Sequence, residues 1–555
     1  MTRRTLPLLV AVVAVAALVA GCSSEKAAAP TSTAKVTTTT ARPKCTVPEG
    51  AGAVSAMPGV TVGADTTPGD EVNVASFDGT SIRTHWFALP GATADHPAPT
   101  VLMGPGWGLA GDTDPKGIGI LGAMSIGGLQ EAGYNVLTWD PRGFGKSGGE
   151  AKVDNKDFEG KDVQRLISFV AGLPGVQLDG PGDPRMGMVG ASYGGGIQFV
   201  TAATDCRVDA IVPVIAWHSL ETSLYKAKVP KSGWATILTG VSALGKIDPH
   251  IMSAKKSGDA TSTVSAEDFA WFQSRGPSEL VNDVKVPTLI VQGTVDTLFT
   301  LAEGVQNYGI VNDNGVPVAM VWFCGGHGLC NAKGGDPKRV GTDIINWLDR
   351  YVKDDSTAAK VPGFDMVDQD GVRYTAPKWP LAAGAPITAS GSGTLELTKD
   401  SRSQGPVSAA TAGDTVGRLS EQIMPGVAKV AVDVQIPFGD RSALVVGAPT
   451  LQLTYSGTVP DGPQPEAVFA QLVDTSNQKV VGQQITPVAL QLDGKVHSLK
   501  VDLEMIAFAA KAGKSVTLQL VATTSAYATP RLGGSVDFSK IGIALPTVTS
   551  AKPAG

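Results

Sequence analysis

The sequence lacks the basic segments that are typical of nucleic-acid-binding proteins. Only 17% of its 555 residues are charged, the net charge is -6, and no run rich in lysine and arginine occurs beyond the N-terminus. A nucleic-acid partner requires a positive surface that neutralises phosphates. We therefore expect no nucleic-acid partner.

Long apolar runs are also lacking, apart from one near the N-terminus. This run, Leu6 to Ala20, follows two arginines and is too short to span a bilayer comfortably. It ends in Val19-Ala20-Gly21-Cys22, which resembles the lipobox of bacterial lipoproteins. We expect residues 1–21 to be a lipoprotein signal peptide and Cys22 to be lipidated, which would hold the exported protein on the extracytoplasmic face of the cell membrane. An ordinary secretory signal with an incidental cysteine is the alternative.

Cysteine is scarce, with five residues in the chain. An exported protein leaves the reducing cytosol, so the four cysteines that follow Cys22 can be oxidised, and four cysteines permit three pairings. The short separation of Cys324 and Cys330 favours a local disulfide, which would leave Cys45 and Cys206 for each other. The sequence does not decide the pairing of these last two.

The rest of the composition indicates two folded domains after a disordered tether at residues 22–45. Hydrophobic residues make up 43% of the chain, and 555 residues exceed the usual size of one domain. After a predicted hairpin between Glu71 and Trp86, short apolar runs alternate with helical stretches, which predicts an α/β fold with a parallel sheet. The predicted buried strands are Pro99 to Gly104, Tyr134 to Trp139, Met186 to Val189, Val208 to Ala216, Pro287 to Gln292 and Val316 to Phe323.

The predicted boundaries follow from these patterns. Residues 46–380 form the first domain, in which a helical face that ends near Lys353 closes the strand series. The segment at about 217–280 is too long for a plain connection and predicts an inserted helical cap. After Trp379-Pro380 the chain becomes rich in Gly, Ser, Thr and Val, with runs such as Ala428 to Val434, so residues 386–548 predict an all-β sandwich.

A candidate nucleophile follows the strand that ends at Val189. Gly190-Ala191-Ser192-Tyr193-Gly194 has the pattern of a nucleophile elbow and opens a helical stretch. The sharp turn projects the Ser192 hydroxyl above the sheet, and the helix N-terminus favours developing negative charge. A structural Gly-Ser turn is the alternative.

Histidine is the other scarce residue, since there are only six. A serine hydroxyl needs an adjacent base, and His327 lies just beyond the final predicted strand. His218 is the second choice. It lies at the end of another predicted strand, but it precedes any plausible acid in the chain. Asp296 follows the strand that ends at Gln292, so we expect its carboxylate to orient the imidazole. Asp313 lies too far along the chain for this role, on the approach to the next strand.

The sequence also suggests an oxyanion hole and a substrate pocket. The backbone N–H of Tyr193 is the first expected donor, and that of Trp107, in Gly104 to Gly108, is the second. Asp140 to Gly145 predicts a turn that packs against the elbow. Further tryptophans could build an apolar pocket, although core packing is equally plausible for each, namely Trp217, Trp234 and Trp271.

Together these motifs resemble the X-Pro dipeptidyl-peptidase and cocaine-esterase family of α/β-hydrolases. The motifs are Gly104 to Gly108, Asp140 to Gly149, Gly190 to Gly196, Val286 to Asp296 and His327. The resemblance implies an α/β-hydrolase domain with a helical cap, a C-terminal jelly-roll, and acyl transfer to water. Some esterases of the family add a tyrosine hydroxyl to the oxyanion hole, whereas this chain has Trp107 there.

We therefore expect a serine hydrolase that needs no metal or organic cofactor and acts on a small ester or peptide. Acyl esters are the expected preference over X-Pro amides, because the cap segment shows no obvious carboxylate clamp for an ammonium group. An inactive surface lipoprotein that acts as a binding module is the alternative from another class. The sequence does not indicate an oligomeric state.

Overall fold

The computed structural model describes residues 45–52, 54, 70–117, 119, 124–328, 330, 337–405 and 423–554. The predicted signal peptide, Cys22 and all of the tether except Cys45 lie outside the described residues. Within the described ranges, no helix has the length and apolar character needed to cross a membrane.

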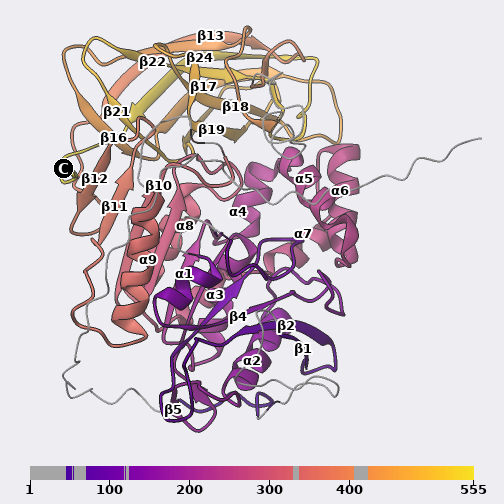
Figure 1. Ribbon diagram of the computed structural model, residues 1–555. Helices are drawn as coiled ribbons and strands as arrows, with labels where there is room; N and C mark the ends of the chain where they lie inside the picture. Colours follow the sequence, from indigo (N-terminus) through magenta and orange to yellow (C-terminus); the bar gives the residue numbers. More distant parts are fainter. Residues whose placement is uncertain are drawn as a thin grey trace, which may run out of the picture.

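An eleven-stranded sheet forms the centre of the first domain (Figure 1). The β2–β4 pair is antiparallel, and every pair from β4 to β11 is parallel, which confirms the predicted α/β sheet. In spatial order the strands are β1 (Asp70–Ala75), β2 (Ser81–Phe87), β4 (Asn135–Trp139), β3 (Thr100–Gly104), β7 (Met186–Ala191), β8 (Ala210–Val214), β9 (Thr288–Gly293), β10 (Val318–Phe323), β11 (Phe364–Val367), β12 (Arg373–Ala376) and β26 (Lys552–Pro553).

The strand series does not close at the helix near Lys353, contrary to the sequence prediction. β11 adds in parallel to β10, and β12 and β26 then add antiparallel. These three strands are short, with four, four and two residues, so they show no clear hydrophobic period in the sequence.

Helices cover both faces of this sheet because its strands alternate their buried side chains. Val101, Val189 and Leu289 pack with α1 (Ile126–Glu131) and α9 (Pro337–Tyr351). Leu102, Met188 and Ile290 share a core with the helices on the opposite face, which are α2 (Glu159–Val170), α3 (Tyr193–Thr204) and α8 (Leu301–Asp313).

A helical cap lies between β8 and β9, as predicted. Its helices contact one another in the order α5·α6, α6·α7 and α4·α7. They are α4 (Leu220–Leu224), α5 (Ser232–Val241), α6 (Pro249–Thr261) and α7 (Ala266–Gln273), with the 3-10 turns η1 (Lys226–Lys228), η2 (Ser242–Leu244) and η3 (Ser278–Asp283).

The C-terminal part is an all-β sandwich, which confirms the predicted fold class. Its two larger sheets enclose a separate hydrophobic core. One sheet holds β13 (Ile387–Glu396), β24 (Ser535–Leu545), β17 (Thr450–Thr458) and β20 (His497–Asp502). The other holds β15 (Val432–Pro437), β22 (Ser515–Val521), β18 (Ala467–Asp474) and β19 (Lys479–Ala489). Beside them lie β21 (Ile506–Ala510), β16 (Ala443–Gly447) and β25 (Thr547–Val548), and two short pairs are β14 (Arg402–Ser403) with β23 (Thr523–Thr524) and β5 (Leu178–Gly180) with β6 (Asp183–Pro184).

The sandwich is joined to the first domain by apolar packing as well as by the chain. Val446, Met505 and Ala507 belong to the same core cluster as the side chains beneath the large sheet. The C-terminal strand β26 returns to that sheet and pairs with β12. Figure 1 shows the sandwich lying against both the cap and the edge of the first domain.

Candidate active site

Ser192 stands at a strained turn between β7 and α3. Its φ of 56° and ψ of -115° are unusual for a residue with a side chain, and such strain is typical of functional turns. The turn requires glycine on both sides, because a Cβ at Gly194 would lie 2.1 Å from the carbonyl oxygen of Gly104. At Gly190, with φ of 155°, a Cβ would lie 2.7 Å from that same oxygen. The elbow is therefore packed tightly against the end of β3.

The predicted acid and base meet the serine at the carboxyl ends of the strands. His327 Nε2 lies 2.9 Å from Ser192 Oγ, and His327 Nδ1 lies 2.7 Å from Asp296 Oδ2. Asp296 is fully buried, whereas 13% of the His327 side chain is exposed. This geometry allows His327 to accept the serine proton while Asp296 holds the other ring nitrogen protonated.

Backbone groups fix the orientation of the Asp296 carboxylate. Its Oδ1 accepts hydrogen bonds from the N–H groups of Leu298 and Phe299, at 2.9 and 2.8 Å. Its Oδ2 also accepts the N–H of His327 at 3.1 Å. With three backbone donors, the carboxylate is satisfied despite its burial.

The candidate oxyanion donors lie at the same opening. Tyr193 is the first residue of α3, and the loop after β3 is close to it, since a Cβ at Gly194 would also lie 3.0 Å from the carbonyl oxygen of Pro105. The ring of Trp107 lines the cavity that contains Ser192, and its Nε1 donates to the carbonyl oxygen of Leu238 in the cap. The loop that carries Trp107 is thus held between the elbow and α5.

Behind the elbow lies a buried acidic group that the sequence did not reveal. The Tyr193 hydroxyl donates to Glu159 at 3.2 Å and accepts the N–H of Asp154 at 3.3 Å. Burial raises the pKa of Glu159 to about 7, and burial together with the charge of Glu159 raises the pKa of Asp154 well above its usual value. Asp154 adopts a positive φ of 51°, and both of its carboxylate oxygens are without a hydrogen-bond partner among the described residues.

The turn from Asp140 to Gly145 packs against β2 and α2. Asp140 accepts hydrogen bonds from the N–H groups of Gly111 and Lys146, and its Oδ1 lies 3.3 Å from His85 Nε2. Arg142 forms a buried bidentate pair with Asp162. These contacts give the turn a supporting position.

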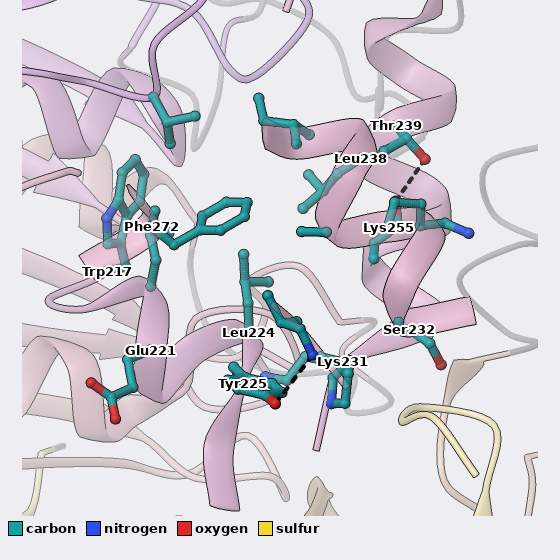
Figure 2. Close-up of a pocket in the computed structure, with 18 of the residues that line it drawn as sticks. Trp217, Glu221, Leu224, Tyr225, Lys231, Ser232, Leu238, Thr239, Lys255 and Phe272 are labelled. Carbon is teal, nitrogen blue, oxygen red and sulfur yellow. Dashed lines mark hydrogen bonds between the residues drawn. The ribbon is translucent and has the colours of Figure 1, made fainter. Parts of the chain in front are cut away.

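An apolar cavity of about 130 Å³ opens at Ser192 and extends under the cap (Figure 2). Its volume is comparable to the ~150 Å³ of engineered cavities that hold a benzene-sized molecule. The aromatic and aliphatic side chains on its wall include Tyr193, Trp217, Leu220, Leu224, Tyr225, Leu238, Ile251, Phe269, Phe272 and Phe299.

The charged side chains on the cavity wall have partners elsewhere. Glu221 accepts from Gln273, and Figure 2 shows its carboxylate directed away from Phe272 and Leu238. Lys255 pairs with Asp259. Lys231 donates to the carbonyl oxygens of Leu298 and Thr297 at 3.0 and 3.2 Å, and burial lowers its pKa to about 8. The centre of the cavity is therefore apolar.

The three predicted pocket tryptophans occupy different positions. Trp217 lines the cavity and packs against Phe299. Trp234 does not line it; its ring meets His327 edge-on at 5.6 Å, and its Nε1 donates to Thr297. Trp271 does not line it either, since it is buried within the cap between His250 and Arg275. Helical burial inside the cap and burial at a pocket wall give the same sequence pattern.

Both expected cysteine pairs are disulfide-bonded. Cys324 is joined to Cys330, on either side of His327, and Cys45 is joined to Cys206. Among the described residues, the group with spacing suitable for a metal is Cys45, Asp205 and Cys206. Because Cys45 and Cys206 are joined in a disulfide, neither offers a thiolate to a metal ion.

The strand order, the elbow and the position of Ser192 at the carboxyl ends of the strands define the class of this protein as an α/β-hydrolase. Comparison with protein families gives a match over part of the chain. The model of the X-Pro dipeptidyl-peptidase (S15 family) matches residues 78–328, which confirms the family resemblance seen in the sequence motifs.

Individual proteins are similar to parts or to most of the chain. The chain is similar to dipeptidyl aminopeptidase BIII of Pseudoxanthomonas mexicana, with 29% identity over 251 residues, which cover 42% of this chain and 31% of that protein's length. Among solved structures, an aminopeptidase from a Thaumarchaeota archaeon has a TM-score of 0.64 at 13% identity, covering 89% of this chain and 98% of that chain. A CocE/NonD family hydrolase from Staphylococcus aureus has a TM-score of 0.62 at 13% identity, covering 90% and 100%. Both likenesses extend over about nine-tenths of this chain, so they include residues of the sandwich as well as of the first domain.

Proposed function

We propose that this chain is a serine hydrolase in which Ser192, His327 and Asp296 form the catalytic triad. The observation that carries the proposal is the continuous relay from Ser192 Oγ to His327 Nε2 at 2.9 Å and from His327 Nδ1 to Asp296 Oδ2 at 2.7 Å. A binding module would have no need for this relay at the mouth of a cavity. The relay therefore favours an enzyme over the alternative of an inactive surface protein.

The proposed mechanism follows from the position of each group. Ser192 Oγ attacks the carbonyl carbon of the substrate as His327 Nε2 takes its proton, and the backbone N–H groups of Tyr193 and Trp107 stabilise the oxyanion. His327 then protonates the leaving group, and an acyl-enzyme forms. Water that is activated by His327 attacks this ester, releases the acid and restores Ser192.

The triad is tested by labelling and by substitution. A fluorophosphonate probe should label the wild-type protein at Ser192 and leave Ser192→Ala unlabelled. His327→Ala and Asp296→Asn should retain the fold and lower kcat by a factor on the order of 10⁴, because the three groups act as a unit. Labelling that persists in Ser192→Ala would contradict the assignment.

We propose an uncharged, apolar acyl group as the preferred substrate moiety. The cavity at Ser192 is lined by aromatic and aliphatic side chains, and its acids Glu221 and Asp259 already have partners. An ammonium group bound there without a carboxylate would lose its hydration without compensation. This arrangement supports acyl esters over X-Pro amides.

The second candidate is an X-Pro dipeptidyl-peptidase, which the S15 family match favours. Comparing kcat/KM for a butyrate ester and for an alanyl-prolyl anilide decides between the two. We expect the ester to be turned over faster. Because esters are intrinsically easier to cleave, a ratio that favours the anilide would establish the peptidase.

We also propose that the protein is exported and anchored through a lipid on Cys22. Disulfides persist mainly in oxidising compartments, so the two disulfide bonds support export. Mass spectrometry of the mature N-terminal peptide should find a diacylglyceryl group on Cys22, and a Cys22→Ala variant should leave the membrane fraction.

A further inference from the structure

The loop that carries Asp296, residues 294–300, is held by residues of the cap and of the sandwich. From the cap, Lys231 donates to the carbonyl oxygens of Thr297 and Leu298, and Trp234 donates to Thr297 Oγ1. From the sandwich, the buried Glu504 accepts the Thr300 hydroxyl at 2.7 Å and pairs with Lys226 of the cap at 2.5 Å. We call residues 294–300 the acid loop.

The sandwich reaches the acid residue itself through a bulge in β19. Between the pairs Gln471–Ile485 and Val473–Val480, one residue of β18 lies opposite four residues of β19, Val481 to Gln484. In this bulge, Gly482 has a φ of 62° and Gln483 a φ of 56°. Bulges re-aim side chains, and a strained non-glycine residue persists only where its surroundings enforce it.

Gln484 projects from the bulge onto the acid loop. Its Nε2 donates to the main-chain carbonyl oxygen of Asp296 at 2.9 Å and to that of Gly482 at 3.0 Å. The side chain is 6% exposed, so both hydrogen bonds are shielded from water. Figure 1 shows β19 on the side of the sandwich that faces the first domain.

The same bulge also contacts the loop of the base. A Cβ at Gly328, the residue after His327, would lie 2.8 Å from Gln483 Oε1 and 1.9 Å from the carbonyl oxygen of Val295. The N–H of Gly482 donates to Gln369, in the turn after β11. The bulge thus contacts the acid loop, the residue beside His327 and the edge of the large sheet.

We propose that the bulge Val481 to Gln484 is a positioning element of the hydrolase site, with Gln484 as the positioning residue for Asp296. This inference rests on the proposed triad. Gln484 touches neither substrate nor the reacting atoms; it fixes the backbone of Asp296, and through Asp296 the ring of His327. The sandwich is then a working part of the active site as well as a structural domain.

The deciding variant is Gln484→Met, which keeps the length of the side chain but removes the amide donor. We expect kcat for a butyrate ester to fall by about tenfold, the factor that corresponds to one hydrogen bond, while KM stays within about twofold. The rate of fluorophosphonate labelling of Ser192 should fall in parallel, because labelling requires the same relay. Gln452→Met, at an exposed glutamine on β17 of the same sandwich, is the matched control and should keep wild-type rates.

Gln484→Glu provides a second test should the methionine variant fail to fold. Its carboxylate cannot donate to the Asp296 carbonyl, and its negative charge favours the imidazolium form of His327. We expect a lower kcat and an acid limb of the kcat/KM profile that moves to higher pH. Wild-type kcat, labelling rate and pH profile in a folded Gln484 variant would overturn the positioning role. A wild-type protein that is not labelled at Ser192 would instead overturn the proposed function.

Discussion

At the scale of single residues, Glu159 couples the elbow to a buried acidic environment. Its carboxylate accepts hydrogen bonds from the Tyr193 hydroxyl and from the N–H groups of Lys152 and Asn155, and only 3% of the residue is exposed. Burial raises its pKa from 4.5 to about 7. The charge that it acquires above that pH lies directly behind Tyr193, the first residue of the helix that follows Ser192.

This raised pKa predicts a pH-dependent stability. The native state holds the Glu159 proton more tightly than the unfolded chain, so its stabilising contribution is complete below about pH 4.5 and is lost as the pH rises through about 7. Glu159→Gln has no such loss. The free energy of unfolding of the variant, relative to that of the wild type, should therefore rise by on the order of 3 kcal/mol between pH 4 and pH 8. Urea unfolding at the two pH values measures the difference, and an equal difference at both would contradict the assignment.

A second prediction at this scale concerns Gly328, the residue after His327. Gly328→Ala places a methyl group against Val295 and Gln483, so it should push the His327 loop away from the acid loop and lower kcat by at least about tenfold. Gly309→Ala is the matched control, because a Cβ there meets nothing within 4 Å and Gly309 lies inside α8. That control should stabilise the protein by up to about 1 kcal/mol. Equal kcat values in the two variants would disprove the effect.

At the scale of elements, the two disulfides act on very different lengths of chain. The Cys45–Cys206 bond closes a separation of 161 residues and connects the segment before β1 to the end of α3, whereas the Cys324–Cys330 bond closes six residues around His327. Loop-closure entropy grows with loop length, so the first bond should contribute more to global stability. The second should contribute more to the placement of the base.

Serine replacements of each pair separate these roles. Removing the Cys45–Cys206 bond should lower the free energy of unfolding by about 5 kcal/mol, against about 2 kcal/mol for Cys324–Cys330. The second pair of replacements should nevertheless cause the larger fall in kcat. Denaturant unfolding and ester hydrolysis measure both effects, and peptide mapping without reduction checks the pairing; a larger kcat loss in the first variant would reverse the conclusion.

At the scale of the whole molecule, the sandwich and the first domain share one core. Val446, Met505 and Ala507 pack into the cluster beneath the large sheet, and β26 extends that sheet after the chain has passed through the sandwich. The acid loop is also held from the sandwich, by Gln484 and Glu504. The first domain therefore depends on the second for packing, and we propose that it also depends on it for the position of Asp296.

A truncated chain tests this dependence. A chain that ends at Pro380 exposes the apolar surface covered by those three residues and loses both contacts to the acid loop, so it should be insoluble or melt more than about 10 °C below the full chain. A chain that ends at Thr549 removes only β26 and the residues beside it, and it should stay folded. Wild-type kcat from the chain that ends at Pro380 would show that the domains are independent.

The sequence by itself determined the α/β sheet, the cap and the positions of Ser192, Asp296 and His327 relative to the strands. These features were readable because each candidate residue directly follows an apolar strand, and the carboxyl ends of parallel strands meet at one edge of a sheet. Asp296 and His327 are 31 residues apart along the chain, and His327 and Ser192 are 135 residues apart. This rule predicts that they nevertheless lie close together.

Only the tertiary structure decided which residues support that edge. Gln484 lies 188 residues from Asp296 and belongs to another domain, and its role depends on a bulge that leaves no periodic signal. The same holds for the tryptophans, since Trp217 and Trp271 are both buried and only the packing of the cap against the sheet places one of them at the cavity. Local patterns specify strands and turns, whereas contacts between domains depend on the docked shape of the whole chain.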